Sequence, residues 1–137
     1  MGPVPSIDTA SRESKSLSRK RINLGKRGEE VAAAYLRAKG YRIKARNYRQ
    51  KTGEIDIICK DGDTHVFVEV KTRQHCEFGH PTEAVTRRKQ MQISRTALLY
   101  LNIEELLDTP VRFDVIGVIL KEWGPEISHI VGAFEAE

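Results

Sequence analysis

The pattern of apolar and polar positions predicts a helix over residues 22–39. Its apolar stripe repeats at helical spacing and consists of Ala32, Ala33 and Leu36. Gly40 follows and suits the left-handed position that ends many helices. Glu29 lies on the same stripe, where an unpaired charge is costly to bury. We therefore expect Glu29 to do something that an apolar residue could not.

Three strands are predicted next. Residues 41–49 alternate apolar and basic side chains, as a half-exposed strand does. Residues 54–60 are almost continuously apolar, which is typical of a strand covered on both faces. The tight turn "DGD" at 61–63 leads to residues 64–73, which are rich in β-branched side chains. The two central strands therefore form a predicted hairpin.

A second helix and two further strands complete the pattern. The helix is predicted over 83–101, with Thr82 as its N-cap and an apolar face made of Ala84, Met91, Ala97, Leu98 and Leu101. Residues 111–120 and 126–134 read as strands. The order of helix, three strands, helix and two strands predicts an α/β fold, with helices on both faces of one sheet.

Charged residues interrupt the predicted hairpin. Asp56 lies in its first strand, and Glu69 and Lys71 share one face of its second. A turn at 61–63 places Asp56 roughly opposite Glu69, with Cβ atoms about 5 Å apart. Two carboxylates that close repel each other unless a proton or a cation lies between them. A hard cation such as Mg²⁺ binds one or two carboxylates and keeps several waters.

An ordinary salt bridge is the alternative interpretation of these charges. Asp56 or Glu69 can pair with Lys71 on an exposed strand face, and such triplets are common in strands. Against this, both acids lie in apolar strands, and Glu29 adds a third acid from a helix stripe. Solvated surface charge does not explain acids that converge on one sheet, so a metal site competes with the salt bridge on equal terms.

The first 20 residues are predicted to form a disordered basic tail, because they mix Pro, Ser and charge with almost no apolar periodicity. Residues 21–137 then form a single domain. The basic cluster around the boundary consists of Arg19, Lys20, Arg21, Lys26 and Arg27. It either contacts phosphate or serves as a solubilising arm.

Composition narrows the class of protein. The net charge of +4 favours a polyanionic partner without proving one. Two cysteines make no disulfide framework, so a reduced, cytoplasmic location is expected. The apolar run at 115–120 is far shorter than the roughly 20 residues of a membrane span, so no membrane association is expected. His75, Cys76 and His80 lack a second ligand pair, and we expect no zinc site.

Other charged residues carry open alternatives. Arg46 and Arg49, beside Tyr48, either line a nucleic-acid groove or guard a strand edge with charge. Lys89 either supports the site and contacts phosphate or belongs to a solvated helix face. Arg112 and Asp114 share a strand face and are expected to pair with each other.

The spacing of Asp56, Glu69 and Lys71, after a helix that carries Glu29, resembles the PD-(D/E)xK motif of restriction-endonuclease-like nucleases. Five segments in order also resemble the small bacterial YraN family, whose relatives include archaeal Holliday-junction resolvases: "GKRGEEVAAAYLRAKGYRIKARNYR", "GEIDII", "VFVEVKTR", "AVTRRKQ" and "RFDVIGV". The resemblance covers about residues 22–120. Ile55 stands where the motif has proline, which leaves the aspartate in place.

The resemblance implies an αβββαβ restriction-endonuclease-like core with a mixed central sheet. It makes Asp56 and Glu69 ligands of Mg²⁺ or Mn²⁺, together with the backbone carbonyl of Val70. Lys71 becomes the catalytic lysine, and Glu29 joins the site.

The implied reaction is hydrolysis of phosphodiester bonds in DNA, with branched or single-stranded DNA as substrate in repair or recombination, and a homodimer is plausible. Basic residues would grip the backbone, namely Arg46, Arg49, Arg73, Arg88 and Lys89. The alternatives are a nucleic-acid-binding module that keeps the fold without chemistry, and a partner-binding structural protein.

Overall fold

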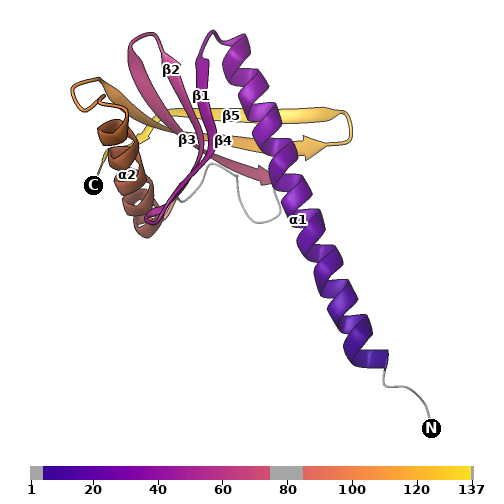
Figure 1. Ribbon diagram of the computed structural model, residues 1–137. Helices are drawn as coiled ribbons and strands as arrows, with labels where there is room; N and C mark the ends of the chain where they lie inside the picture. Colours follow the sequence, from indigo (N-terminus) through magenta and orange to yellow (C-terminus); the bar gives the residue numbers. More distant parts are fainter. Residues whose placement is uncertain (1–4, 75–84, 137) are drawn as a thin grey trace.

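Seven elements make up the computed structural model, which describes residues 5–74 and 85–136 (Figure 1). They are α1 (Pro5–Ala38), β1 (Arg42–Gln50), β2 (Gly53–Asp61), β3 (Thr64–Arg73), α2 (Arg87–Ile103), β4 (Val111–Lys121) and β5 (Gly124–Phe134). The strands form one sheet in the order β1-β2-β3-β4-β5. Neighbours are antiparallel except β3 and β4, which are parallel and are connected through α2. The predicted αβββαβ core with a mixed sheet is confirmed, and β5 extends it.

The C-terminal half of α1 covers one face of the sheet. Its predicted stripe is buried, and it packs on side chains of the three central strands, namely Ile57, Cys59, Val66, Val68, Ile116 and Val118. The helix ends as the sequence predicted. Gly40 has a φ of +91°, and the amide of Tyr41 donates to the carbonyl of Leu36 at 3.0 Å.

α1 begins earlier than the sequence predicted. It starts at Pro5, whereas the apolar pattern indicated a start near residue 22 and no regular structure before it. Residues 6–24 contain no glycine or proline to break a helix. Figure 1 shows this N-terminal part extending away from the sheet, so it has no apolar stripe because it has no sheet to cover.

α2 covers the opposite face of the sheet. Its buried side chains include Ile93, Ala97, Tyr100 and Leu101, which pack on Phe67 and its neighbours. The prediction that Met91 and Leu98 belong to the apolar face was wrong, because these side chains are 36% and 59% exposed. The helix is rotated so that Thr96 and Ser94 are buried in their place.

The start of α2 also differs from the prediction. Thr86 is the N-cap, and its hydroxyl accepts a hydrogen bond from the amide of Lys89 at 3.2 Å. The predicted cap at Thr82 and the predicted helical residues 83 and 84 lie outside the described residues, while Val85 and Thr86 are not helical. The same cap chemistry is therefore present one helical turn later.

In the part of the chain described, neither helix combines the length and apolar character that crossing a membrane requires.

Candidate active site

Asp56 and Glu69 meet where the β2–β3 hairpin opens. The turn contains Gly62 at a φ of +60°, and the strand pairing runs from it as far as Ile57 and Val68. The next two residues in that register are Asp56 and Glu69. Beyond the last pair, the Asp56 side chain replaces a backbone carbonyl of β2 as the acceptor. Its Oδ2 accepts a 2.8 Å hydrogen bond from the amide of Val70. The predicted juxtaposition of the two acids is confirmed.

Burial makes this pair of acids electrostatically unfavourable when both are ionised. Burial, and then the charge of Glu69, raise the pKa of Asp56 to about 7, against its ordinary 3.8. Burial also raises the pKa of Glu69, although the charges of Lys89 and Lys71 oppose this. At neutral pH the site therefore holds crowded carboxylates that a proton or a cation would stabilise.

Glu29 reaches the same place from α1. Its pKa is raised by burial and then by the negative charge of Asp56, which shows that the two acids are neighbours. α1 can approach so closely because of Gly28. A Cβ at Gly28 would lie 1.7 Å from the Thr72 hydroxyl of β3, so only glycine allows this packing. The third predicted acid thus joins the other two.

Asn47 and Glu54 are parts of the centre that sequence reasoning missed. Asn47 lies opposite Asp56 in the β1–β2 register and has a φ of 52°, a conformation that asparagine tolerates. With its amide nitrogen facing the acids, Asn47 donates to both Glu29 oxygens at 3.0 and 3.2 Å, and to Glu54 Oε1 at 3.2 Å. Arg49 Nε lies 3.5 Å from Glu54 Oε1. One amide therefore holds acids from α1 and β2 together.

Two lysines border the acids on the α2 side. Lys89 Nζ lies 3.8 Å from Glu69 Oε1. Burial lowers the pKa of Lys71, and the nearby charge of Glu69 opposes that shift. Both lysines line a hollow of about 270 Å³ together with Glu69, Val85 and Thr86. The structure thus places Lys71 beside the acids, as predicted, and of the two alternatives for Lys89 it favours a place beside the site.

The donor set fits a hard divalent cation that keeps waters. Among the described residues, no three Asp, Glu, His or Cys side chains form a ready-made metal cage. Mg²⁺ does not need one, because it usually takes one or two carboxylates and completes its shell with water. Asp56 and Glu69 supply those carboxylates. The residues considered for zinc lie outside the described residues, namely His75, Cys76 and His80.

The five basic residues predicted to grip nucleic acid do not form one cluster. Arg46 lies near enough to Glu29 for its charge to lower that acid's pKa, and Arg73 acts similarly on Lys71. In the described part of the chain, the Nε atoms of Arg46 and Arg73 are buried without a hydrogen-bond partner. Arg49 and Arg88 are exposed, on β1 and α2. The set is therefore distributed over β1, β3 and α2.

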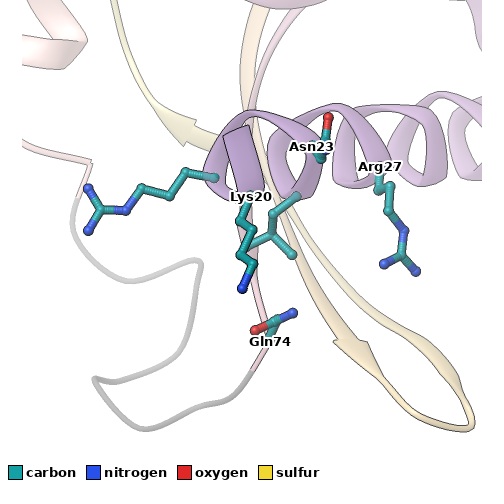
Figure 2. Close-up of a pocket in the computed structure, with 6 residues that line it drawn as sticks. Lys20, Asn23, Arg27 and Gln74 are labelled. Carbon is teal, nitrogen blue, oxygen red and sulfur yellow. The ribbon is translucent and has the colours of Figure 1, made fainter. Parts of the chain in front are cut away.

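Two hollows follow α1 away from the acids. The first, of about 330 Å³, is lined by Arg21, Ile22, Gly25, Lys26, Glu29, Asn47 and Arg49. The second, of about 540 Å³, is lined by Lys20, Arg21, Asn23, Leu24, Arg27 and Gln74. Figure 2 shows the side chains of Lys20 and Arg27 extending from α1, with Gln74 near the end of Lys20.

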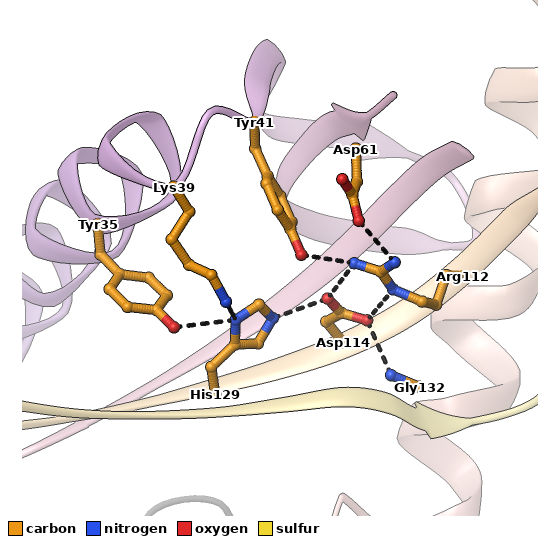
Figure 3. Close-up of polar contacts among 8 residues, drawn as sticks. All are labelled: Tyr35, Lys39, Tyr41, Asp61, Arg112, Asp114, His129 and Gly132. Carbon is orange, nitrogen blue, oxygen red and sulfur yellow. Dashed lines mark hydrogen bonds and ion pairs between the residues drawn. The ribbon is translucent and has the colours of Figure 1, made fainter. Parts of the chain in front are cut away.

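A separate polar network ties the C-terminal end of α1 to the sheet (Figure 3). Asp114 is fully buried and receives two hydrogen bonds from Arg112, at 2.9 and 3.1 Å, which confirms the predicted pairing. His129 Nε2 lies 2.7 Å from the other side of the same carboxylate, and the Gly132 amide donates to it at 3.0 Å. Arg112 also binds Asp61 and the Tyr41 hydroxyl. The network is internally satisfied and structural.

Comparison with known proteins identifies the family. The sequence model of the uncharacterised protein family UPF0102 matches residues 28–118, which include every acid of the centre. The chain belongs to this family. A UPF0102 protein of Geobacter sulfurreducens is 53% identical over 82% of this chain and 88% of its own length. A UPF0102 protein of Syntrophus aciditrophicus is 52% identical over 83% of this chain and 90% of its own length. One of Geotalea uraniireducens is 50% identical over 82% of this chain and 90% of its own length. The family resemblance found in the sequence is therefore confirmed.

Proposed function

We propose that this protein is a metal-dependent endonuclease that hydrolyses phosphodiester bonds in DNA. One observation carries the proposal: acids from three elements, Glu29 of α1, Asp56 of β2 and Glu69 of β3, converge at the open end of a hairpin beside Lys71. Packing alone would favour apolar residues at these positions. Burying these charges costs folding free energy. Ionisable groups with strongly shifted pKa values cluster at functional sites, where they take part in catalysis or binding.

Asp56, Glu69 and the Val70 carbonyl are the groups that would hold Mg²⁺ or Mn²⁺. The amide of Val70 faces β2, since it donates to Asp56. A strand residue directs its N–H and its C=O toward the same antiparallel neighbour, so the carbonyl belongs on the side where Asp56 lies. When bound, the cation supplies Lewis-acid polarisation of a phosphate and an activated water.

The chain's own residues supply position and charge. The ammonium group of Lys71 lies where it can stabilise the negative charge that develops on the phosphate during hydrolysis. Lys89 Nζ lies beside Glu69, and its charge partly opposes the upward pKa shift that burial causes in both hairpin acids, which favours the ionised form that binds cations. Asn47 fixes the carboxylate of Glu29 beside Asp56. The basic residues around the site bind backbone phosphates without reading sequence.

The test is a cleavage assay with Mg²⁺ or Mn²⁺ on linear, flapped and four-way DNA. Native protein is compared with Asp56→Asn and Lys71→Ala, and with Arg37→Gln, an exposed residue of α1 away from the acids. We expect cleavage by native protein and Arg37→Gln, and a loss of at least about a hundredfold in the other two. Equal cutting by native protein and Asp56→Asn would trace the activity to a contaminant and refute the proposal. DNA binding without any cleavage would favour a non-catalytic binding module on the same fold.

Metal binding is tested without reference to activity. Millimolar Mn²⁺ should raise the melting temperature of native protein and leave that of Asp56→Asn unchanged, because a ligand of the folded state stabilises it. The homodimer and the cytoplasmic location stay predictions.

A further inference from the structure

The larger of the two hollows lies on a face of α1 that points away from the acids. Four of its lining residues recur at helical spacing and so share one face of the helix, namely Lys20, Asn23, Leu24 and Arg27. Glu29 is nine residues from Lys20, or about two and a half turns, and therefore lies on the opposite face. Gln74, which directly follows β3, lines the hollow from the side of the sheet (Figure 2). The hollow is thus separate from the candidate active site.

This hollow is lined by cations without acids. Lys20, Arg21 and Arg27 bring three positive charges, and none of the described residues that line the hollow is Asp or Glu. Within the part of the chain that the structure describes, no carboxylate forms an ion pair with any of these three side chains. A concave surface lined by one sign of charge concentrates ions of the opposite sign. The ligand that fits is therefore an anion with several negative charges.

The rest of the lining suits a ligand that is more than a bare anion. The hollow has a volume of about 540 Å³, which is the size of a site for a small organic molecule. Leu24 is half-buried and offers an apolar contact. Asn23 and Gln74 offer amides, which both donate and accept hydrogen bonds. A nucleotide combines charged phosphates with a base that has an apolar face and a polar edge, so it matches all three kinds of group.

The hollow also borders the contact that docks α1 on the sheet. Arg27 directly precedes Gly28, and Gln74 lies two residues after Thr72. The close fit of Gly28 against Thr72 brings α1, and with it Glu29, to the sheet. A ligand held by both Arg27 and Gln74 bridges the helix and the strand beside that contact. Because such a ligand binds only the docked arrangement, it stabilises that arrangement.

We propose that this hollow binds a nucleoside triphosphate, which acts as an effector by stabilising the packing of α1 on β3. Lys20, Arg21 and Arg27 bind the phosphates, while Leu24 and the two amides contact the base. The binding does not depend on the function proposed above. The effect on DNA cleavage does rest on that function, because the packing that the ligand stabilises positions Glu29.

The first experiment measures binding by isothermal titration calorimetry on the full chain, without divalent cations. The probes are the four ribonucleoside triphosphates, inorganic tripolyphosphate and a 12-base-pair DNA duplex. Lys20→Gln/Arg27→Gln removes two cations of the hollow. Arg37→Gln/Arg42→Gln removes two exposed cations elsewhere and is the matched control.

We expect native protein to bind at least one nucleoside triphosphate about threefold or more tightly than tripolyphosphate. The hollow variant should lose at least about tenfold in affinity for that nucleotide, because charge-assisted hydrogen bonds to phosphate are strong. The control should lose less than about twofold. Equal losses in the two variants, or binding of the duplex without any nucleotide, would overturn the proposal. Tripolyphosphate bound as tightly as every nucleotide would mean an adventitious ion only and would overturn it as well.

A second pair of variants tests the contact with the base. Leu24→Ser should weaken nucleotide binding about threefold or more and leave tripolyphosphate binding unchanged. Leu98→Ser, which alters a 59% exposed residue of α2, should change neither. An unchanged nucleotide affinity in Leu24→Ser, or an equal loss on both probes, would overturn the assignment of the base.

Amide hydrogen exchange tests the effector role without reference to activity. A saturating nucleotide should slow exchange at residues 28–36 of α1 about threefold or more in native protein, and should have no such effect in the hollow variant. Unchanged exchange in native protein with nucleotide bound would overturn the effector role.

Failure of this inference is distinguishable from failure of the proposed function. If native protein cuts no DNA but binding and exchange change as described, the endonuclease proposal fails and the nucleotide site stands. If native protein cuts DNA and binds no nucleotide in the calorimeter, the nucleotide site is wrong and the endonuclease stands.

Discussion

The amide of Val70 donates a 2.8 Å hydrogen bond to Oδ2 of Asp56. In an ordinary hairpin that amide would continue the ladder of backbone bonds, so here a side chain replaces the backbone of the partner strand. This side-chain hydrogen bond takes the place of a backbone bond where the hairpin opens, and it fixes one oxygen of the Asp56 carboxylate. Glu69 is the next residue across the gap, and its charge is, after burial, the second cause of the raised pKa of Asp56.

Replacing Asp56 with asparagine should stabilise the protein at alkaline pH. The folded protein holds the Asp56 proton up to a pKa of about 7, whereas an ordinary aspartate releases it near 3.8. Between these values the folded state binds more protons than the unfolded state, so stability falls as pH rises through this window. Asp56→Asn lacks that fall. Chemical denaturation should show the variant at least about 1 kcal/mol more stable than native protein at pH 8, and little different at pH 4. Parallel stability curves would contradict the raised pKa.

Replacing Lys89 with glutamine should raise the pKa values of the hairpin acids. The charge of Lys89 lowers the pKa of both Asp56 and Glu69, and its removal takes away that stabilisation of the carboxylates. We expect both carboxyl groups to titrate at higher pH in a carboxyl NMR titration. Arg95→Gln, on an exposed position of α2, is the control and should shift neither group. The idea fails if the two variants titrate alike.

Replacing Gly28 with alanine should destabilise the fold although alanine favours helices. The new Cβ would overlap the Thr72 hydroxyl at 1.7 Å, and such overpacking costs about 1–3 kcal/mol. This outweighs the gain of about 1 kcal/mol in helix propensity. Gly25→Ala is the matched control, since a Cβ there meets nothing within 4 Å, and it should stabilise the protein by about 0.5–1 kcal/mol. Urea denaturation decides the question, and a stabilising Gly28→Ala would disprove the close approach.

Replacing Asp114 with alanine should be among the most damaging changes. Burial raises the pKa of Asp114, but hydrogen bonds from His129, Arg112 and Gly132 outweigh it and hold the pKa below its ordinary value. Its contribution to stability is therefore present above the unfolded pKa, and it is lost as pH falls through the lower folded pKa.

Removing the carboxylate leaves Arg112 and His129 without their shared partner and should cost about 3–5 kcal/mol at pH 7. Glu126→Gln breaks the more exposed pair with Lys121 and should cost at most about 1 kcal/mol. Comparable losses in the two variants, measured by urea denaturation, would contradict the structural role of the network.

Much of the hairpin could be predicted because its turn determines its register. The "DGD" turn fixes which residues face each other, and the meeting of Asp56 and Glu69 follows from counting back along both strands. The same count along β1 and β2 places Asn47 opposite Asp56. That signal was in the sequence, since Asn47 interrupts the alternation of apolar and basic residues at this position.

Other features depend on packing that the sequence does not encode locally. Met91 and Leu98 have the right spacing for a buried stripe, but the contacts of Tyr100 with Tyr48 and Phe67 rotate α2 toward a different face. The docking of Glu29 depends on the fit between Gly28 and Thr72, which lie 44 residues apart in the chain. The glycine in the helix signalled a close approach, but not its partner.

The close fit between Gly28 and Thr72 also means that the acidic centre depends on the packing of α1 against β3. Glu29 and Asp56 come from α1 and β2, whereas Glu69 comes from β3, and Gly28 meets Thr72 near the end of the same strand. A chain that ends before β3 therefore lacks both the third acid and the contact on which the helix packs. The full acidic centre requires β3 and the packing of α1 on it.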